Sequence, residues 1–247
     1  MVGLSDLPGG WKESYANDVS ADGSVIVGFS HSGNGYESYR WTEATGMVPL
    51  GDLAGNGFRS AAYGVSADGN AVVGHGDSAL GEEAYLWMEA TGMIGLGDLT
   101  GGEFDSRAYA VRAAGTVVVG YGHSESGREA FRWTEQTGMV GLGDLSGGNF
   151  DSWAWDATED GETIVGIGQS GRGNEAFIWD TGHGMRSLQD VLVSDYGVDL
   201  TGWKLSRASS ISADGSVIAG HGLNPSGDRE AWVVMLGEPV PEPSSLV

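Results

Sequence analysis

The chain has 247 residues, no cysteine, and a net charge of −22 with only 12 lysines and arginines. Nucleic-acid binding depends on basic side chains that neutralise phosphates, so a nucleic-acid partner is excluded, and the same charge disfavours anionic membrane surfaces. Disulfides and cysteine metal motifs are impossible. The sequence contains no run of about 18 apolar residues and opens with no basic and apolar leader, so neither a membrane span nor a signal peptide is predicted.

A repeat of 46 residues organises the chain. Its copies span residues 1–46, 47–92, 93–138, 139–184 and 185–237, and a Pro-rich tail, 238–247, follows them. Self-similarity at a period of this length marks a repeat architecture. We therefore predict one folded domain over 1–237, with the tail outside it.

Each copy has the pattern of four short strands. The chain opens on a fourth-strand motif, Met1–Leu7, and the third copy shows the complete unit as Ser106–Val111, Thr116–Gly122, Glu129–Trp133 and Met139–Leu145. Asp-Gly follows the first strand in the other copies and is a strong hairpin-turn signal. The second strand is apolar throughout, whereas the third alternates with period 2. No segment shows a capped helical period, so no helix is predicted.

These units predict an all-β fold, a five-bladed β-propeller. Four antiparallel strands in about 45 residues form one propeller blade. The last copy ends on a third-strand motif, Glu230–Leu236, and so lacks the strand with which the chain begins. We therefore predict that Met1–Leu7 completes the last blade and removes two exposed sheet edges.

Two tryptophan–lysine pairs depart from the five-fold pattern. Trp11 and Lys12 lie in WKES of copy one, and Trp203 and Lys204 lie in WKLS of copy five, where the middle copies contain phenylalanine. In a closed ring the two pairs would lie on adjacent blades. The favoured interpretation is that both tryptophans are hydrophobic anchors between blades. The alternative is a stacking platform for a sugar ring or another flat ligand.

Copy four adds two tryptophans of its own, Trp153 and Trp155, on its first strand. We interpret them first as filling a gap between blades, and second as candidate ligand-binding residues. A further tryptophan repeats regularly on the third strand, which argues for core packing; it is Trp41, Trp87, Trp133 and Trp179, with Val234 in the fifth copy.

Two acidic positions recur in all five copies. The aspartate is Asp6, Asp52, Asp98, Asp144 and Asp190, and the glutamate is Glu37, Glu83, Glu129, Glu175 and Glu230. A short carboxylate before a glycine turn most often accepts backbone N–H groups, so we predict that the aspartate holds the crossover to the next blade. Calcium, which needs six to eight converging oxygens, is the alternative ligand, and no other cofactor is predicted. The glutamate is predicted to bond a neighbouring blade or turn.

A catalytic site would require unlike residues from different blades. Asp18 and Asp156 occupy equivalent first-strand positions and could form an acid/base pair, although packing or solvation is the favoured interpretation. The histidines are scattered and are interpreted as solvated; they are His31, His75, His123, His183 and His221. No Ser-His-Asp set or nucleotide-binding glycine loop is present.

The repeat resembles the HAF family of extracellular repeats. The matching motifs of this chain are Leu142–Leu145, Ser106–Ala108, Val118–Gly120 and Glu129–Trp133. Glu129 stands where the family has histidine, so no role of that histidine is transferred. The resemblance implies an exported protein of unassigned activity.

The tail segment Val240–Leu246 resembles the start of a PEP-CTERM sorting signal, without the apolar helix and basic cluster that follow it in that family. This resemblance implies export to the surface or extracellular matrix of a bacterium. The architecture is also similar to that of the tachylectin type of five-bladed lectin.

We therefore expect a non-enzymatic, monomeric scaffold or recognition module whose partner is an extracellular polysaccharide or a surface protein. A lectin with sites between blades is the first alternative. An enzyme that acts on polysaccharide through carboxylates is the second.

Overall fold

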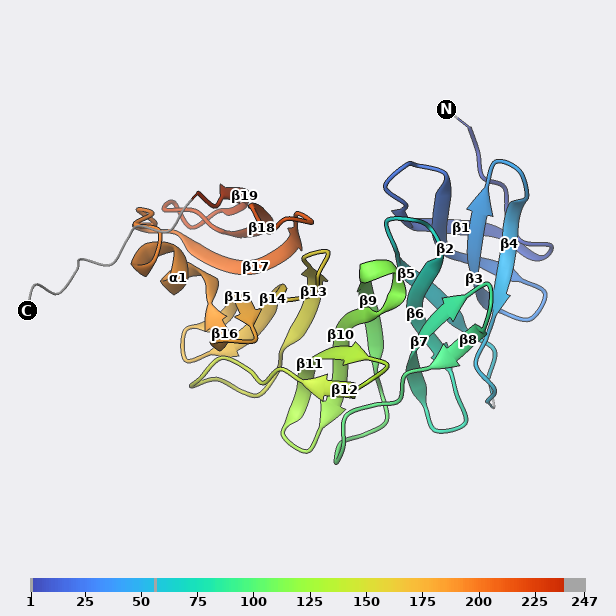
Figure 1. Cartoon of the computed structure of the whole chain (residues 1–247), viewed down its shortest axis with the longest axis horizontal. Helices are drawn as coiled ribbons and strands as arrows, with labels where there is room; N and C mark the ends of the chain where they lie inside the picture. The colour runs from blue at the N-terminus through green and yellow to red at the C-terminus, as the bar shows by residue number, and fades with distance from the viewer. Residues whose placement is uncertain (1, 56, 238–247) are drawn as a thin grey trace, which may run out of the picture. The chain divides into compact units, whose positions relative to one another are not determined.

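The computed structural model describes residues 2–55 and 57–237 (Figure 1). The chain forms two compact units, Met1–Gly141 with three antiparallel sheets and Leu142–Val247 with two. The single domain predicted from the repeat stays a prediction, and the predicted tail at 238–247 lies outside the described residues.

The first unit contains three sheets in which each strand pairs with the next along the chain. The first sheet consists of β1 (Gly9–Val19), β2 (Val25–Ser32), β3 (Tyr36–Thr42) and β4 (Gly46–Gly51). The second consists of β5 (Ser60–Val65), β6 (Ala71–Asp77), β7 (Glu82–Met88) and β8 (Gly92–Gly95). The third consists of β9 (Arg107–Arg112), β10 (Val117–Ser124), β11 (Gly127–Thr134) and β12 (Gly138–Gly141), with a 3-10 turn, η1 (Ala113–Gly115), between β9 and β10. The predicted four-stranded unit is confirmed, although the fourth strand is shorter than expected.

The second unit contains a four-stranded and a three-stranded sheet. The fourth sheet consists of β13 (Trp153–Ala157), β14 (Thr163–Ser170), β15 (Gly173–Asp180) and β16 (Gly184–Ser187). The fifth consists of β17 (Lys204–Ile211), β18 (Val217–Leu223) and β19 (Arg229–Met235).

A helix between these two sheets corrects the prediction that the chain is free of helices. It is α1 (Leu188–Ser194), and it stands where the other copies have an extended crossover. Ser187 caps its N-terminus by accepting the N–H of Asp190, and its buried residues, Leu188, Val191 and Leu192, have helical spacing. The helix has fewer than three turns, which is too short for its period to stand out in the sequence.

The predicted strand at Met1–Leu7 is also wrong for the residues that the structure describes. Residues 2–7 form no strand, and the fifth sheet has three strands. The segment instead attaches to the first sheet: Leu7 is buried, its N–H donates to the Ser30 hydroxyl, and the Ser14 hydroxyl donates to the Ser5 carbonyl. These local contacts explain why residues 5–7 follow the first sheet.

A ladder of alanine, glycine and an aromatic ring crosses the centre of every sheet. In the third sheet Ala108 pairs with Gly120, and Gly120 pairs with Phe131, whose ring is fully buried. A Cβ on Gly120 would lie 1.9 Å from the Arg107 carbonyl oxygen, so a side chain is excluded there. The other ladders are Ala16–Gly28–Tyr39, Ala62–Gly74–Tyr85, Ala154–Gly166–Phe177 and Ala208–Gly220–Trp232.

Apolar residues between sheets of the same unit form the core. In the first unit one cluster joins Val73 and Leu86 of the second sheet to Val111 and Val118 of the third, and Trp133 packs against it. Trp87 packs against a second cluster, and Val234 against the cluster of the second unit. The core role predicted for the repeated tryptophan position is therefore confirmed in these three copies.

The Asp-Gly turns owe their shape to a hydroxyl two residues before the aspartate. In the first sheet the Ser20 hydroxyl and the Ser24 N–H both donate to Asp22, and Gly23 has a positive φ. These hydrogen bonds lower the pKa of Asp22 to about 2. The third copy has Arg112, Ala113 and Ala114 instead, and both alanines adopt positive φ angles near 50°, a conformation that disfavours a β-carbon.

We expect the double substitution Arg112→Ser and Ala114→Asp to stabilise the protein by about 1 kcal/mol, because it restores the hydrogen-bonded Asp-Gly turn and removes one strained alanine. Chemical denaturation of the variant and the wild type measures the difference. Ala114→Ser, which adds a hydroxyl without the carboxylate, is the control. An unchanged or lower denaturation midpoint for the double variant would contradict the expectation.

Candidate functional site

The recurring aspartates that precede the second, third and fourth sheets hold their crossovers, as predicted. Asp98 accepts the backbone N–H groups of Leu99 at 2.7 Å, Asp105 at 2.8 Å and His123 at 2.9 Å. Asp52 and Asp144 each accept the N–H groups of the three residues at the equivalent positions of their own copies. Burial raises the pKa of all three carboxyls above the usual value, against the effect of the N–H donors. Their oxygens are thus occupied by backbone groups rather than arranged around a cation.

The first and last copies use the same position differently. Asp190 lies in α1 and is paired with Arg172 at 2.6 Å, with its side chain 61% exposed. In the first copy the following residue, Leu7, donates its N–H to Ser30 rather than to Asp6. Within the described residues no group of three or more histidine, aspartate or glutamate side chains could hold a metal ion.

Three of the recurring glutamates, Glu83, Glu175 and Glu230, accept hydrogen bonds from local partners. Glu83 accepts the N–H of Gly97 at 3.0 Å, in the crossover that follows its sheet. Glu175 is 2% exposed and accepts from Ser170, Arg172 and Ser187. Glu37 is buried, Glu129 is half-buried, and Glu230 is exposed and accepts from Asn224.

Asp18 and Asp156, the proposed acid/base pair, hold neighbouring strands together. Asp18 accepts the N–H of Val65 in the second sheet at 2.8 Å. Asp156 accepts the N–H of Ile211 at 3.0 Å and the Ser210 hydroxyl at 2.9 Å. Both carboxylates therefore have a structural role between adjacent sheets of their own unit.

The sequence suggested that all five histidines are solvated, and the structure shows that this is wrong for at least one of them. His75 is buried on β6, and burial lowers its pKa to about 3, so it is neutral near pH 7. His31 stacks on Trp11, His123 lies near Asp105, and His183 is paired with Asp180 at 2.8 Å. His221 is exposed.

The two tryptophan–lysine pairs have different surroundings. Trp11 is 74% exposed on β1, and Lys12 is exposed beside it. Trp203 packs against the core cluster of the second unit, and Lys204 donates to the Arg172 carbonyl at 2.6 Å. The anchor interpretation therefore holds for Trp203 and fails for Trp11. Trp11 belongs to the first unit and Trp203 to the second, so their adjacency stays a prediction.

Five positions of the repeat carry chemically different side chains in different copies, and we call them the variable group. None of these positions has the same residue in more than two copies. They are, copy by copy, Glu13, Tyr15, Asn17, Phe29 and Tyr36; Arg59, Ala61, Tyr63, His75 and Glu82; Asp105, Arg107, Tyr109, Tyr121 and Arg128; Asp151, Trp153, Trp155, Ile167 and Asn174; and Leu205, Arg207, Ser209, His221 and Arg229. Five of the twelve basic residues lie here, so the scarce positive charge is concentrated at these positions.

In the fourth sheet the variable group lines a cavity of about 350 Å³. Trp153 and Trp155 stack with ring centroids 5.6 Å apart, and the Arg207 guanidinium, from the fifth sheet, lies 3.7 Å from the Trp155 ring centroid. Asp151 accepts the indole N–H of Trp153 at 2.9 Å and fixes its orientation. Ile167 and Asn174 complete the lining. Indole faces beside a carboxylate, an amide and a guanidinium suit a small ligand with an apolar face and polar edges.

In the second and third sheets the variable group is linked by side-chain interactions. Glu82 forms ion pairs with Arg59 and Arg107, and Tyr63 and Tyr109 lie 5.5 Å apart. Arg107 thus reaches from the third sheet to the second, as Arg207 reaches from the fifth to the fourth. The same repeat positions therefore make an ion-paired cluster in one unit and an open cavity in the other.

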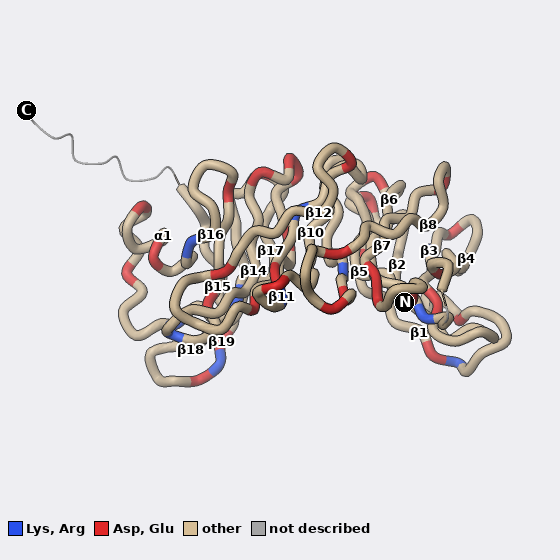
Figure 2. The backbone as a smooth tube through the Cα atoms, turned by 90° about the horizontal axis from the view of Figure 1, so that it is seen from below, with Lys and Arg blue, Asp and Glu red and all other residues tan. Residues whose placement is uncertain are grey.

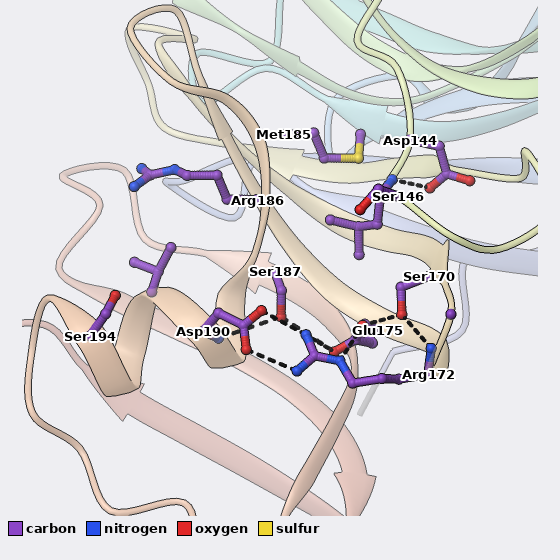
Figure 3. A pocket seen from close by; sticks show the side chains of 13 residues that line it. Asp144, Ser146, Ser170, Arg172, Glu175, Met185, Arg186, Ser187, Asp190 and Ser194 are labelled. Atoms are coloured by element: carbon purple, nitrogen blue, oxygen red, sulfur yellow. Dashed lines mark hydrogen bonds and ion pairs between the residues drawn. The ribbon is translucent and has the colours of Figure 1, made fainter.

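A second cavity, of about 680 Å³, lies beside α1 (Figure 3). Figure 3 shows the Arg172 guanidinium between Glu175 and Asp190, with Ser170 and Ser187 next to Glu175. In the second copy the equivalent glutamate, Glu83, receives a backbone N–H from the crossover. Because α1 replaces that crossover, Arg172 supplies the donor instead. The polar network of this cavity is explained by the fold.

Sequence reasoning found Trp153 and Trp155 but missed Asp151, Asn174 and Arg207. A comparison of the copies could have found Asp151 and Asn174. The middle copies have the same residues at the structural positions, whereas their side chains vary at the positions of the variable group. The contribution of Arg207 could not be predicted from the sequence, because this residue comes from the neighbouring sheet.

No protein-family model matches the chain, and no curated protein matches its sequence. The HAF and PEP-CTERM resemblances therefore stay predictions. Solved structures are similar in fold. TolB from Acinetobacter baumannii matches with a TM-score of 0.58 and 16% identity over 92% of this chain and 56% of that chain. A TolB from Agrobacterium tumefaciens matches with a TM-score of 0.53 and 16% identity over 89% of this chain and 73% of that chain.

A prolyl endopeptidase structure matches with a TM-score of 0.57 and 11% identity over 93% of this chain and 35% of that chain. The chain spans about half the length of TolB from Acinetobacter baumannii. At these identities the likeness concerns the fold, which is all-β and built from antiparallel sheets as in β-propellers. Within the described residues, no helix is long and apolar enough to cross a membrane.

Proposed function

We propose that the chain is a five-bladed β-propeller that acts as a non-enzymatic recognition module and binds a sugar residue in the cavity of the fourth sheet. The observation that carries the proposal is the stacked pair of Trp153 and Trp155 in a cavity with directional polar groups. The C–H face of a pyranose ring is apolar and packs on an indole. Its hydroxyls can donate to Asp151 and exchange hydrogen bonds with Asn174.

Two further observations support recognition over catalysis. Asp18 and Asp156 accept backbone N–H groups of adjacent sheets, which favours a structural role over that of an acid/base pair. The variable group changes its chemistry from copy to copy on a constant framework, and binding residues are typically placed in this way on a rigid scaffold.

We expect Trp153→Ala to weaken sugar binding tenfold or more, because it removes one of the two stacked indoles that line the cavity. A glycan array with the wild-type protein, with and without calcium, identifies the sugar, and titration of the intrinsic tryptophan fluorescence measures its affinity. Val193→Ala, an exposed apolar residue of α1 outside the cavity lining, is the matched control. Unchanged affinity in Trp153→Ala, or no binding to any glycan, would refute the proposal; the latter result would favour a scaffold.

We also propose that the protein is exported from a bacterial cell. The support is the resemblance of the repeat to HAF repeats and of the tail to the start of a PEP-CTERM signal. Fractionation of the native host with an antibody to the protein tests this proposal, and recovery in the cytoplasmic fraction alone would refute it.

A further inference from the structure

The first sheet presents a group of stacked aromatic rings, which we call the aromatic platform: Trp11, Tyr15, Phe29, His31 and Tyr36. Trp11 and Tyr15 are exposed, and the other three rings are half-buried. Trp11 is 74% exposed and lies parallel to His31, with ring centroids 5.1 Å apart and an interplanar angle of 11°. Tyr15 is 48% exposed and stacks on Phe29 at 4.8 Å. Tyr36 contacts both stacks edge-on, at 5.2 Å from His31 and 5.7 Å from Phe29. Two aromatic stacks are thus joined on one surface of β1, β2 and β3.

Hydrogen bonds hold these rings in place. The carboxylate of Glu13 accepts the hydroxyls of Tyr15 at 2.7 Å and Tyr36 at 3.1 Å. The backbone N–H of Trp11 donates to Nδ1 of His31 at 3.4 Å. Hydrogen bonding to Glu13 raises the pKa of both tyrosines, because the carboxylate stabilises their protonated hydroxyls. A surface fixed before binding loses little conformational entropy when a ligand arrives.

The platform and the cavity use the same positions of the repeat. Glu13, Tyr15, Phe29 and Tyr36 are the first-copy members of the variable group, and they correspond to Asp151, Trp153, Ile167 and Asn174 of the cavity. Both sites therefore place a carboxylate beside stacked aromatic rings. The cavity can enclose one small ring, whereas the platform is open and can support a longer ligand.

We infer that the aromatic platform is a second glycan-binding surface and that the natural ligand is a neutral polysaccharide chain. The inference rests on the proposed function of the cavity. Aromatic faces beside a carboxylate match the alternating C–H faces and hydroxyls of a sugar chain. The net charge of −22, with acidic residues spread along both units (Figure 2), opposes polyanionic chains. Two sites on one protein strengthen binding to a polymer that can reach both.

The test compares a soluble neutral β-glucan, an oligosaccharide prepared from it, and polygalacturonate as a polyanion. Affinity electrophoresis and calorimetry are performed on the wild type, Trp11→Ala, Trp153→Ala and the double variant. Val19→Ala, an exposed apolar residue on the same strand outside the platform, is the control. Because Trp11 is mostly exposed, its replacement should leave the denaturation midpoint unchanged, which is checked first.

We expect Trp11→Ala to lower the affinity for the glucan polymer by about tenfold and to leave binding of the short oligosaccharide at the cavity unchanged. We expect Trp153→Ala to lose oligosaccharide binding and retain weak polymer binding. If Trp153→Ala has no effect, the cavity proposal fails; if Trp11→Ala has no effect on the polymer, the platform inference fails. Stronger binding to polygalacturonate than to the glucan also overturns the inference. Sedimentation of the wild type provides a further test. An oligomer that Trp11→Ala dissociates would overturn the inference, because the platform would then be a protein interface.

Discussion

Replacement of Asp98 by alanine is expected to lower the free energy of unfolding by about 4 kcal/mol. The carboxylate accepts three backbone N–H groups, from Leu99, Asp105 and His123. A buried donor left without an acceptor costs about 1–3 kcal/mol. These three donors are partly buried, so water that enters the vacated space recovers part of this cost. Urea denaturation at neutral pH, followed by circular dichroism, measures the change.

The repeat supplies a matched control for this experiment. Asp190 occupies the same repeat position, but its side chain is 61% exposed and its partner is the half-exposed Arg172. Exposed ion pairs contribute about 0–1 kcal/mol, so Asp190→Ala should cost about 1 kcal/mol or less. Asp98→Asn should lie between the two, because an amide keeps one acceptor oxygen. Equal losses for Asp98→Ala and Asp190→Ala would show that the three N–H bonds are not the cause.

Gly166→Ala is expected to destabilise the fourth sheet by about 3 kcal/mol or more. The added Cβ would lie 2.0 Å from the Trp153 carbonyl oxygen and 2.5 Å from a carbon of the Phe177 ring. Neither neighbour can move freely: the carbonyl belongs to the paired strand, and the Phe177 ring is fully buried. Overpacking of such a site typically costs about 1–3 kcal/mol, and here the strand pairing is disturbed as well.

Gly171→Ala, in the loop at the end of the same strand, is the control. A Cβ there meets no atom closer than 3.5 Å, so the effect should stay within about 0.5 kcal/mol. Thermal unfolding of the two variants and the wild type, followed by near-ultraviolet circular dichroism, separates the outcomes. Similar midpoints for Gly166→Ala and Gly171→Ala would show that the sheet relaxes around the new carbon.

The recurring alanine and glycine show that the sequence repeat does not reveal which residues face each other in a sheet. Both recur in all five copies, and the sequence indicates that each is needed. It does not show that Ala108 and Gly120 face each other, or that Phe131 lies on the other side of the glycine. Strand pairing with a register shift between Val119 and Gly120 decides this arrangement, and register depends on both strands together.

The candidate site was only partly predictable for a similar reason. An aromatic pair that departs from the pattern of its repeat is visible in the sequence, so Trp153 and Trp155 were identified. Arg207, which completes the cavity, is 52 residues away from Trp155 and belongs to another sheet. Conversely, Trp11 and Trp203 have the same sequence context but differ in burial. Trp203 follows the segment that contains α1 and packs on a core that the first copy lacks.

The repeat by itself determined the number of sheets, their antiparallel strands, the glycine turns and the crossover role of the aspartates before the second, third and fourth sheets. These features depend on local spacing, turn chemistry and hydrogen bonds within one copy and its neighbour. Only the tertiary structure decided the helix at Leu188–Ser194, the absence of a strand in residues 2–7, and the division of the variable group into an ion-paired cluster, a cavity and an exposed platform. Each of these depends on which surfaces pack together, and packing is a property of residues distant in the sequence.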